Sequence, residues 1–468
     1  MKVLMFGWEF PPHISGGLGT ACFGITESLV KSNIEVLFVI PKADAETRKN
    51  HLEIINASNV VIPIAADEVN RSVHPFTTTT RKSKKSVSKL TTLCISSALM
   101  PYTAPDVLGG SINLLKWNYQ LPQPSVVREA TKVGVRFQFS GTYGPSLMKE
   151  AEAFALTAVE IAKHREFDVI HAHDWLTYAA GMAAKKISGK PFVAHVHATE
   201  YDRAGENIDA NIYKIEREGM EAADLVIAVS QWTKNIITTR YHIPAGKVRV
   251  VHNGILSHKK KRNIPLPSIG KKVVTFLGRI TYQKGPEYFV EAAARVLQVY
   301  PDVHFVMAGS GDLLPKMIER VAHLRISSRF HFTGFLKSDL VDRIWSVTNV
   351  YVMPSVSEPF GISPLEAVQA GVPVIISNQS GVAEVMKHVI KIDFWNVEAL
   401  ADAICNLLKY QSLSKVVIRN STQEIKYITW KKAAQKINTI YHELTVKNKE
   451  TLSELVLSGA PAQAVGPV

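Results

Sequence analysis

The stretch from Tyr351 to Ser377 constrains the fold more than any other part of this 468-residue sequence. It reads YVMPSVSEPFGISPLEAVQAGVPVIIS, and its apolar start stops at Pro354, as a buried strand does when it meets a loop. A short helical segment follows and ends at Gly371, after which Val374–Ile376 form a second apolar strand. The pattern predicts two parallel strands joined by a helix, the unit of an α/β sheet.

The loop inside this unit lies at the carboxyl end of a strand and faces a helix start. Open α/β sheets bind ligands at such places, and the free N–H groups there favour an anion. Ser363 is a favourable N-cap, Pro364 suits the first turn, and Glu366 completes the sequence pattern of a capping box. Glu358 puts a carboxylate where a phosphate would be favoured. We interpret Glu358 as a functional, uncompensated charge; a solvated loop residue is the alternative.

Length and composition describe a globular chain of two or three domains. The chain is too long for one ordinary core, and 46% hydrophobic with 20% charged residues is typical of soluble proteins. The apolar runs are strand-sized and the N-terminus lacks a signal-peptide pattern, so we expect neither a membrane span nor secretion. Three widely spaced cysteines (Cys22, Cys94, Cys405) give no disulfide framework and no metal pattern, which predicts a reducing cytoplasm. The net charge of +13 predicts attraction to anions, whether nucleic acid, membrane or phosphorylated small molecules.

Residues 1–255 predict a first domain, which opens with strand, helix and strand up to Ile40. Its first turn, Gly16–Gly19, lets the backbone approach a pyrophosphate, although such a turn also serves tight packing. Over about 63–132 we expect an irregular insertion, because the rhythm of strands and helices is lost there. Its basic piece Arg71–Leu90 predicts a solvated loop; contact with an anionic surface or with the acceptor is the alternative.

Two later strands of the first domain each end in a pair of histidines. His171 and His173 lie in DVIHAHDW, and His195 and His197 lie in KPFVAHVHATEYDR. Alternation places each pair on one face of its strand. Four histidines at neighbouring strand ends offer metal ligands, so a metal-dependent hydrolase is an alternative function. The other interpretation is a set of buried, hydrogen-bonded histidines.

A basic, proline-containing break at 256–270 predicts a linker, and residues 271–428 repeat the rhythm of strand, loop and helix as a second domain. Arg279 and Lys284 flank the loop after its first strand. A guanidinium fork and an ammonium point charge together suit a diphosphate. Residues 429–446 predict a last helix and 447–468 a disordered tail.

Together these motifs resemble those of retaining glycosyltransferases with the GT-B fold, above all bacterial glycogen and starch synthases and the family 4, or group 1, transferases. The resemblance rests on the Gly16–Gly19 turn, His-Asp-Trp at His173, Gly-Arg-x₄-Lys-Gly at Arg279 and Lys284, and Glu358 with Glu366. It implies two Rossmann-like, doubly wound parallel-sheet domains with a cleft between them. It also implies that the helix over 429–446 crosses back to the first domain.

The resemblance further implies a role for each matched residue. Glu358 lies beside the donor sugar, Glu366 binds the nucleotide ribose, and His173 contacts a sugar hydroxyl. Arg279 and Lys284 bind the donor diphosphate. The other donor-binding positions are Gly16, Gly17, Gly309, Gly361 and Ile362, and His197 matches a position near the acceptor side. Apart from the resemblance, glucans stack on aromatic side chains, so Trp175 and Tyr201 near the strand ends are candidate acceptor-side residues; ordinary core residues are the alternative.

The predicted activity is transfer of glucose from ADP- or UDP-glucose to the non-reducing end of an α-1,4-glucan. No metal or other cofactor is implied, and the partners are a nucleotide-sugar donor and a glycan acceptor, not nucleic acid; membrane association is open but not favoured. Ile14 departs from the pattern, because the synthases usually carry a lysine there, the usual sign of ADP-glucose. Alternatives are a transferase for surface polysaccharide or lipid-linked glycan, and a nucleotide-sugar sensor without turnover.

Overall fold

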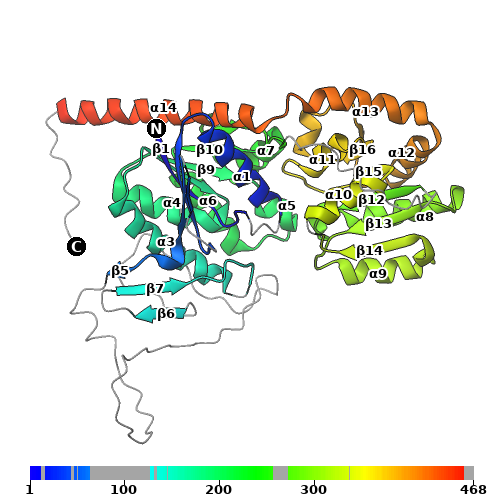
Figure 1. Ribbon diagram of the computed structural model, residues 1–468, viewed down its shortest axis with the longest axis horizontal. Helices are drawn as coiled ribbons and strands as arrows, with labels where there is room; N and C mark the ends of the chain where they lie inside the picture. The colour runs from blue at the N-terminus through cyan, green and yellow to red at the C-terminus, as the bar shows by residue number, and fades with distance from the viewer. Residues whose placement is uncertain are drawn as a thin grey trace, which may run out of the picture.

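The computed structural model describes residues 1–11, 16–43, 47–49, 51–63, 127–130, 134–144, 146–256, 272–336 and 338–457. Figure 1 shows two α/β bodies side by side, connected along one edge by the last two helices of the chain. Each body has its own sheet of mainly parallel strands between helices. This confirms the predicted fold class of two doubly wound parallel-sheet domains.

The first domain is built on an eight-stranded sheet in the order β11-β10-β9-β8-β1-β2-β4-β3. Neighbouring strands are parallel except β3 and β4. The central strands are buried on both faces, because helices cover both sides of the sheet, and apart from the histidines of β8 and β9 their buried side chains are apolar. The strands are β1 (Lys2–Phe6), β2 (Glu35–Ile40), β3 (Thr47–Lys49), β4 (Leu52–Asn56), β8 (Val169–His173), β9 (Phe192–Val196), β10 (Leu225–Ala228) and β11 (Val248–Val250).

The helices of this domain form a layer on each face of the sheet, and separate apolar clusters fill the two layers. They are α1 (Gly17–Val30), α3 (Leu147–His164), α4 (Trp175–Ser188), α5 (Glu200–Ala204), α6 (Ala210–Ala222) and α7 (Gln231–Arg240), with the short 3₁₀ turns η1 (Ala57–Asn59) and η2 (Ala245–Lys247). A small antiparallel sheet stands apart in the order β5-β7-β6, from β5 (Ile62–Pro63), β6 (Val127–Ala130) and β7 (Gly134–Gln138). Its strand β6 lies within the predicted insertion 63–132, most of which is outside the described residues.

The second domain has a fully parallel six-stranded sheet in the order β14-β13-β12-β15-β16-β17. Its strands are β12 (Val273–Leu277), β13 (His304–Ala308), β14 (Phe330–Gly334), β15 (Val350–Met353), β16 (Val374–Ser377) and β17 (Ile390–Ile392). Its helices are α8 (Pro286–Val299), α9 (Leu314–His323), α10 (Ser338–Val347), α11 (Ser363–Gln369), α12 (Val397–Lys409) and α13 (Gln411–Ile425), with 3₁₀ turns η3 (Tyr282–Lys284), η4 (Ser327–Arg329) and η5 (Gly381–Glu384). Of the predicted linker 256–270, only residue 256 is described.

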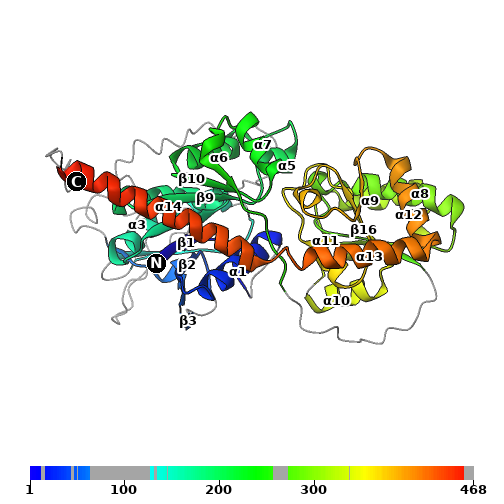
Figure 2. The ribbon, with the colours of Figure 1, turned by 90° about the horizontal axis from the view of Figure 1, so that it is seen from above.

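Helix α14 (Trp430–Leu457) crosses from the second domain back onto the first, as Figure 2 shows. The indole of Trp430 packs so closely on Gly24 of α1 that a Cβ there would lie 2.4 Å from the ring. The helix passes the predicted end at 446 and continues to Leu457, so the expectation of a disordered tail from 447 is wrong for that part. Its sequence explains this, because Lys, Glu and Leu are strong helix formers.

Within the described residues, no helix is both long enough and apolar enough to span a bilayer.

Candidate active site

Glu358 lies in the loop between β15 and α11, and it is buried with 5% of its surface exposed. One of its carboxylate oxygens forms an ion pair with Lys284 and accepts a hydrogen bond from the Ser355 hydroxyl at 3.2 Å. The expectation of an uncompensated charge is therefore wrong. The sequence could not show the pairing, because 74 positions separate the two residues.

A glycine places Lys284 against this loop. Gly285 follows Lys284 in the left-handed region (φ +61°), and a Cβ there would lie 2.2 Å from the carbonyl oxygen of Pro354. The carbonyl of Gln283 also accepts the N–H of Val356 at 2.9 Å. Two loops from different strands are thus joined at the carboxyl edge of the second sheet, the place where α/β sheets bind ligands.

The start of α11 differs from the expectation. Ile362 is the N-cap and no side chain caps the helix, so the predicted capping box of Ser363 and Glu366 is absent among the described contacts. The hydroxyl of Ser363 instead pairs with the Tyr351 hydroxyl at 2.8 Å, because the buried tyrosine brings its own polar group to that point. Glu366 lies half-buried on the first turns of α11. Gly361 precedes the helix with φ +99°, a conformation that side chains rarely adopt.

Arg279 follows β12 on the same sheet edge as Lys284, and its side chain is exposed. In the part of the chain that the structure describes, Arg279 forms no ion pair. Gly309 follows β13 with φ +143°, and a Cβ there would lie 1.8 Å from the carbonyl oxygen of Gly278. Backbone packing therefore accounts for Gly309 without a ligand, and its predicted donor contact stays a prediction.

The opposite holds for the glycines at the start of α1. Gly16 has extended backbone, and a Cβ built on Gly16 or Gly17 meets no atom within 4 Å. In the free protein, neither the space around Gly16 nor its backbone conformation therefore requires a glycine at this position. Among the described residues no side chain caps α1 and its first turn carries no acidic side chain, an arrangement in which the N–H groups of a helix start can bind an anion.

The four histidines at the ends of β8 and β9 form a stacked, hydrogen-bonded array. His171 bonds the Tyr441 hydroxyl of α14 at 2.5 Å through Nδ1 and His195 at 3.1 Å through Nε2. His173 bonds His197 at 2.9 Å. Burial lowers the pKa of His171 and of His197 to about 3, so both rings are neutral at pH 7. The predicted face-sharing of each pair is confirmed by ring stacking at 4.4 Å and 4.2 Å.

The same array is the candidate metal site. One nitrogen from each of His171, His173 and His195 lies within 4.8 Å of the others, and neutral imidazoles are the form that binds metal. Two pairs of nitrogens in the array are bonded to one another, His171 Nε2 with His195 Nδ1 and His173 Nδ1 with His197 Nε2. The alternative interpretation, buried histidines that satisfy each other, accounts for these contacts, although Nε2 of His173, Nε2 of His195 and Nδ1 of His197 have no partner among the described residues.

Asp174, the residue after β8, is held in a strained conformation with φ +59°, which is uncommon outside glycine. Its carboxylate accepts the N–H groups of His197 at 2.6 Å and Ala198 at 3.3 Å, and its own N–H bonds the His195 carbonyl. Burial raises the pKa of Asp174 to about 7. The residue thereby fixes the end of β9, and the position of His197, relative to β8.

The aromatic residues predicted on the acceptor side lie mainly in the core. Trp175 is 8% exposed within the apolar cluster of the first domain, and Tyr201 packs edge-on against Tyr213 and Tyr241. Core packing accounts for them without a ligand, so their acceptor contacts stay predictions.

One pair in the first domain was not predicted from the sequence. Glu9 is 7% exposed, just after β1, and accepts a hydrogen bond of 2.6 Å from the hydroxyl of Tyr143, which is 45% exposed. Desolvation and then Glu9 raise the pKa of Tyr143, and the guanidinium of Arg279 opposes that rise. Arg279 of the second domain therefore lies near this pair. The one available signal was a carboxylate just beyond the first strand.

Direct contacts join the two domains beside the Glu358 loop. The Ser357 hydroxyl donates to Asp202 at 2.5 Å and accepts from the indole of Trp232 at 3.0 Å. On another element, Glu384 accepts both the Gln231 and Trp232 N–H groups at the start of α7. The residue next to Glu358 is thus held by the first domain, so motion between the domains would move the loop.

Comparison with known families agrees with this geometry. The family description "Glycosyl transferases group 1" matches residues 257–424, and "Glycosyltransferase Family 4" matches residues 122–256. The chain is a group 1 glycosyltransferase. The first match contains Arg279, Lys284, Glu358 and Glu366, and the second contains His173 and His197.

Relatives of this glycosyltransferase carry several names. An uncharacterized glycosyltransferase of Methanocaldococcus jannaschii, MJ1607, is 28% identical over 94% of this chain and 98% of its own length. Glycogen synthase of Mycobacterium tuberculosis is 23% identical over 82% of this chain and 80% of its own. The structure of Anabaena HepE in complex with UDP-glucose superposes with a TM-score of 0.59 at 16% identity, covering 95% of this chain and all of that one, which shows the shared GT-B fold.

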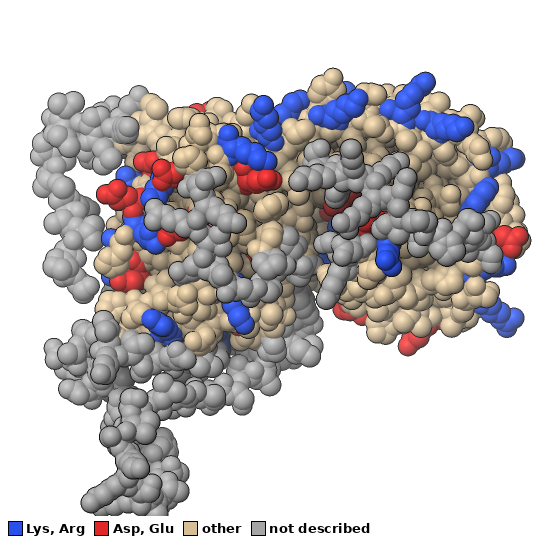
Figure 3. Space-filling model, in the orientation of Figure 1, with Lys and Arg blue, Asp and Glu red and all other residues tan. Residues whose placement is uncertain are grey.

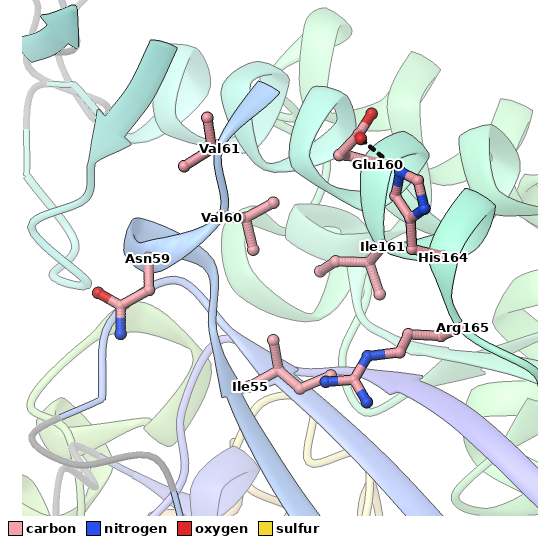
Figure 4. Close-up of a pocket in the computed structure, with 8 residues that line it drawn as sticks. All are labelled: Ile55, Asn59, Val60, Val61, Glu160, Ile161, His164 and Arg165. Atoms are coloured by element: carbon pink, nitrogen blue, oxygen red, sulfur yellow. Dashed lines mark hydrogen bonds and ion pairs between the residues drawn. The ribbon is translucent and has the colours of Figure 1, made fainter. Parts of the chain in front are cut away.

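A surface hollow of the glycosyltransferase lies away from these residues, between β4, η1 and the end of α3 (Figure 4). It is lined by Ile55, Asn59, Val60, Val61, Glu160, Ile161, His164 and Arg165. Glu160 and His164, one helical turn apart, bond each other there at 2.8 Å. No predicted site residue lines the hollow, so it is not a candidate active site.

Proposed function

We propose that this glycosyltransferase moves glucose from ADP- or UDP-glucose to the non-reducing end of an α-1,4-glucan, with retention of the α configuration. The observation that carries the proposal is the ion pair between the half-buried Lys284 and the buried Glu358, beside the exposed Arg279, at the carboxyl edge of the second sheet. A cation held by a carboxylate in the free protein becomes available to a diphosphate when the donor binds.

The leaving group requires stabilisation of negative charge. As the bond between sugar and phosphate breaks, the diphosphate gains charge, which Arg279, Lys284 and the open N–H groups at Gly16 and Gly17 would stabilise in a site shielded from water. Glu358, released from Lys284, would orient the sugar and favour its positive character. Glu366 would hold the ribose of the nucleotide, near the turn formed by Gly361 and Ile362.

Retention is supported by the carboxylates of the first domain. Glu200 forms an ion pair with Arg203 at 2.9 Å, and Asp202 bonds Thr199 and Ser357. Both are buried and occupied, so neither suits the general base that attack from the back face requires. Attack by the acceptor on the same face, guided by the leaving phosphate, is the mechanism that we infer.

The acceptor assignment rests on neutral hydrogen-bonding groups. The imidazoles of His173 and His197 carry no charge at pH 7, and Glu9 with Tyr143 adds a carboxylate and a phenol. These groups suit sugar hydroxyls better than a phosphorylated acceptor, because the carboxylate would repel phosphate. The relationship to glycogen synthase supports a glucan. We place the reaction in the cytoplasm and without a metal cofactor.

Release of nucleotide diphosphate from ADP-glucose and from UDP-glucose, with and without glycogen, tests the proposal. Proton NMR of maltooligosaccharides incubated with the preferred donor then reports the new linkage. We expect glycogen-dependent release and a new α-1,4 anomeric signal. A β-linked product would overturn retention and direct attention to Glu9 as the base. Donor hydrolysis without chain extension would instead favour the transferases for surface polysaccharide or lipid-linked glycan.

A further inference from the structure

A row of basic side chains follows α13 and the first turn of α14, on the outer edge that joins the two domains. Figure 3 shows Lys and Arg gathered along this upper edge, and Figures 1 and 2 agree that the two helices follow one another there. We call this surface the α13–α14 ridge, and it consists of Lys415, Arg419, Lys426, Lys431 and Lys432, all exposed.

Helical geometry places these cations outward. Lys415 and Arg419 are four residues apart on α13, and Lys426 follows after seven more, so all three lie on one face. The opposite face, with Val417 and Ile425, is buried against the domain. Lys415, Arg419 and Lys426 therefore share one outer face rather than being scattered around the helix.

The ridge carries no neutralising carboxylate among the described residues. No ridge cation forms an ion pair, whereas on α9 Lys316 pairs with Glu287 at 2.5 Å and Arg320 with Glu291 at 2.6 Å. The acidic residue within the ridge segment, Glu424, is turned away and accepts bonds from the backbone of residues 387 and 388 and from the His388 ring. The positive charge of the ridge thus remains available to a partner.

Exposed apolar side chains accompany the cations: Tyr410 and Leu413 precede Lys415 in the chain, and Val416 and Tyr427 lie between ridge cations. Tyr410, Leu413, Val416 and Tyr427 are four of the thirteen large hydrophobic residues that the structure finds exposed, and all four lie within residues 410–427. Tyr427 is 69% exposed, and the ammonium of Lys432 lies 4.9 Å from its ring centre. Exposed aromatic and aliphatic groups among unpaired lysines are the combination that binds the boundary between lipid headgroups and acyl chains.

We propose that the α13–α14 ridge docks this glycosyltransferase on the surface of a bilayer rich in anionic phospholipid. The cations meet the phosphates of the headgroups, and Tyr427 and Val416 enter the interface. Nucleic acid is the less suitable partner, because its phosphates would meet the cations and leave the aliphatic side chains without a contact. The ridge lies on helices α13 and α14, whereas the candidate active site lies at the carboxyl edges of the sheets. Docking through the ridge therefore uses none of the candidate catalytic residues.

Co-sedimentation of the full chain with vesicles tests the proposal. We expect binding to vesicles of phosphatidylcholine with phosphatidylglycerol, weakening with salt, and little binding to phosphatidylcholine alone. Each lysine or arginine near an anionic surface strengthens partitioning roughly fivefold, so the triple change Lys415→Gln, Arg419→Gln and Lys426→Gln should weaken it on the order of a hundredfold. Thermal unfolding of the variant checks that it remains folded.

A matched control separates the ridge from net charge. The triple change Lys316→Gln, Arg320→Gln and Arg329→Gln removes the same charge from paired positions on the second domain, and it should leave vesicle binding within a few-fold of the parent. Tyr427→Ser should weaken binding while leaving its salt dependence intact. Equal loss in both triple variants would overturn the proposal. So would ridge-dependent binding to duplex DNA or RNA without binding to anionic vesicles.

Discussion

The carboxyl edges of the two sheets carry different kinds of polar side chains, neutral on the first sheet and charged on the second. On the first sheet, β8 and β9 end in buried imidazoles that bond one another and stay neutral, because burial disfavours their charged form. On the second sheet, the corresponding loops carry charge: Lys284 paired with Glu358, and an exposed Arg279. The same architecture thus offers hydrogen bonds on one side and ionic groups on the other. A reaction between a neutral sugar hydroxyl and a charged nucleotide donor needs both.

The largest effect should follow from removing the charge at Glu358. We expect Glu358→Gln to lose most turnover, on the order of a thousandfold, while it still binds the nucleotide, because the carboxylate acts on the sugar. Ser355→Ala is the matched control, since it removes only the neutral hydrogen bond to the same oxygen and should cost far less. Single-turnover rates and nucleotide titration measure the two parts. Near-normal turnover of Glu358→Gln would show that the charge of Glu358 has no role in the reaction.

Replacing either cation of the charged edge should lower the catalytic rate by a similar factor, but only the replacement of Lys284 should also lower the stability of the fold. Arg279→Ala and Lys284→Ala should each weaken catalysis by on the order of a hundredfold, since each removes charge stabilisation of the leaving diphosphate. Lys284→Ala also leaves the buried Glu358 without its partner, which costs about 3–5 kcal/mol when such a pair is broken. The exposed Arg279 has no such partner among the described residues.

Urea unfolding and steady-state rates measure both variants, with Lys316→Ala as the control for an exposed, paired lysine. If Lys284→Ala were as stable as Arg279→Ala, the ion pair would contribute little to the free protein. In that case the proposed exchange of Lys284 from Glu358 to phosphate would lose its basis.

The sequence predicted one edge better than the other, for physical reasons. Strand alternation alone places His171 and His173 on one face, and it was sufficient to group the four histidines. The pairing of Lys284 with Glu358 depends on Gly285 bringing η3 against Pro354, which no local pattern reveals. Similarly, Ser363 suits an N-cap locally, yet a tyrosine buried twelve residues earlier takes its hydroxyl.

The parallel strands were predictable because their apolar runs and helix ends are local signals. Contacts between distant segments were not. The bond between Glu9 and Tyr143 joins residues 134 positions apart, and one partner follows a segment without periodicity. A helix that crosses to the first domain was expected. The hydrogen bond between His171 and Tyr441 could still not be predicted, because it depends on the exact path of α14 over that domain.

The neutral edge should appear in the pH dependence of stability. The pKa of His171 and of His197 is about 3 in the native protein against 6.5 in an ordinary histidine, so below pH 6.5 the unfolded chain binds protons that the native chain does not. The free energy of unfolding should therefore be full above about pH 6.5 and fall as the pH approaches 3. His171→Gln should reduce this slope, besides its loss of the Tyr441 bond. His442→Gln, an exposed site next to Tyr441 on α14, should retain it; equal slopes in both variants would contradict neutral burial.

The smallest expected effect is that of a chelator, which should leave activity unchanged. Protein cations take the charge of the leaving diphosphate in the proposed mechanism, so EDTA removes nothing that the reaction needs. The histidine array supplies the counter-argument, because its nitrogens lie near enough to share an ion. The neutral edge would be shown to bind a metal if EDTA abolished activity and zinc restored it. The His195→Gln variant should then not recover activity with zinc. Both sheet edges would then carry charge, and the contrast between them would disappear. The metal-dependent alternative would replace the proposed mechanism.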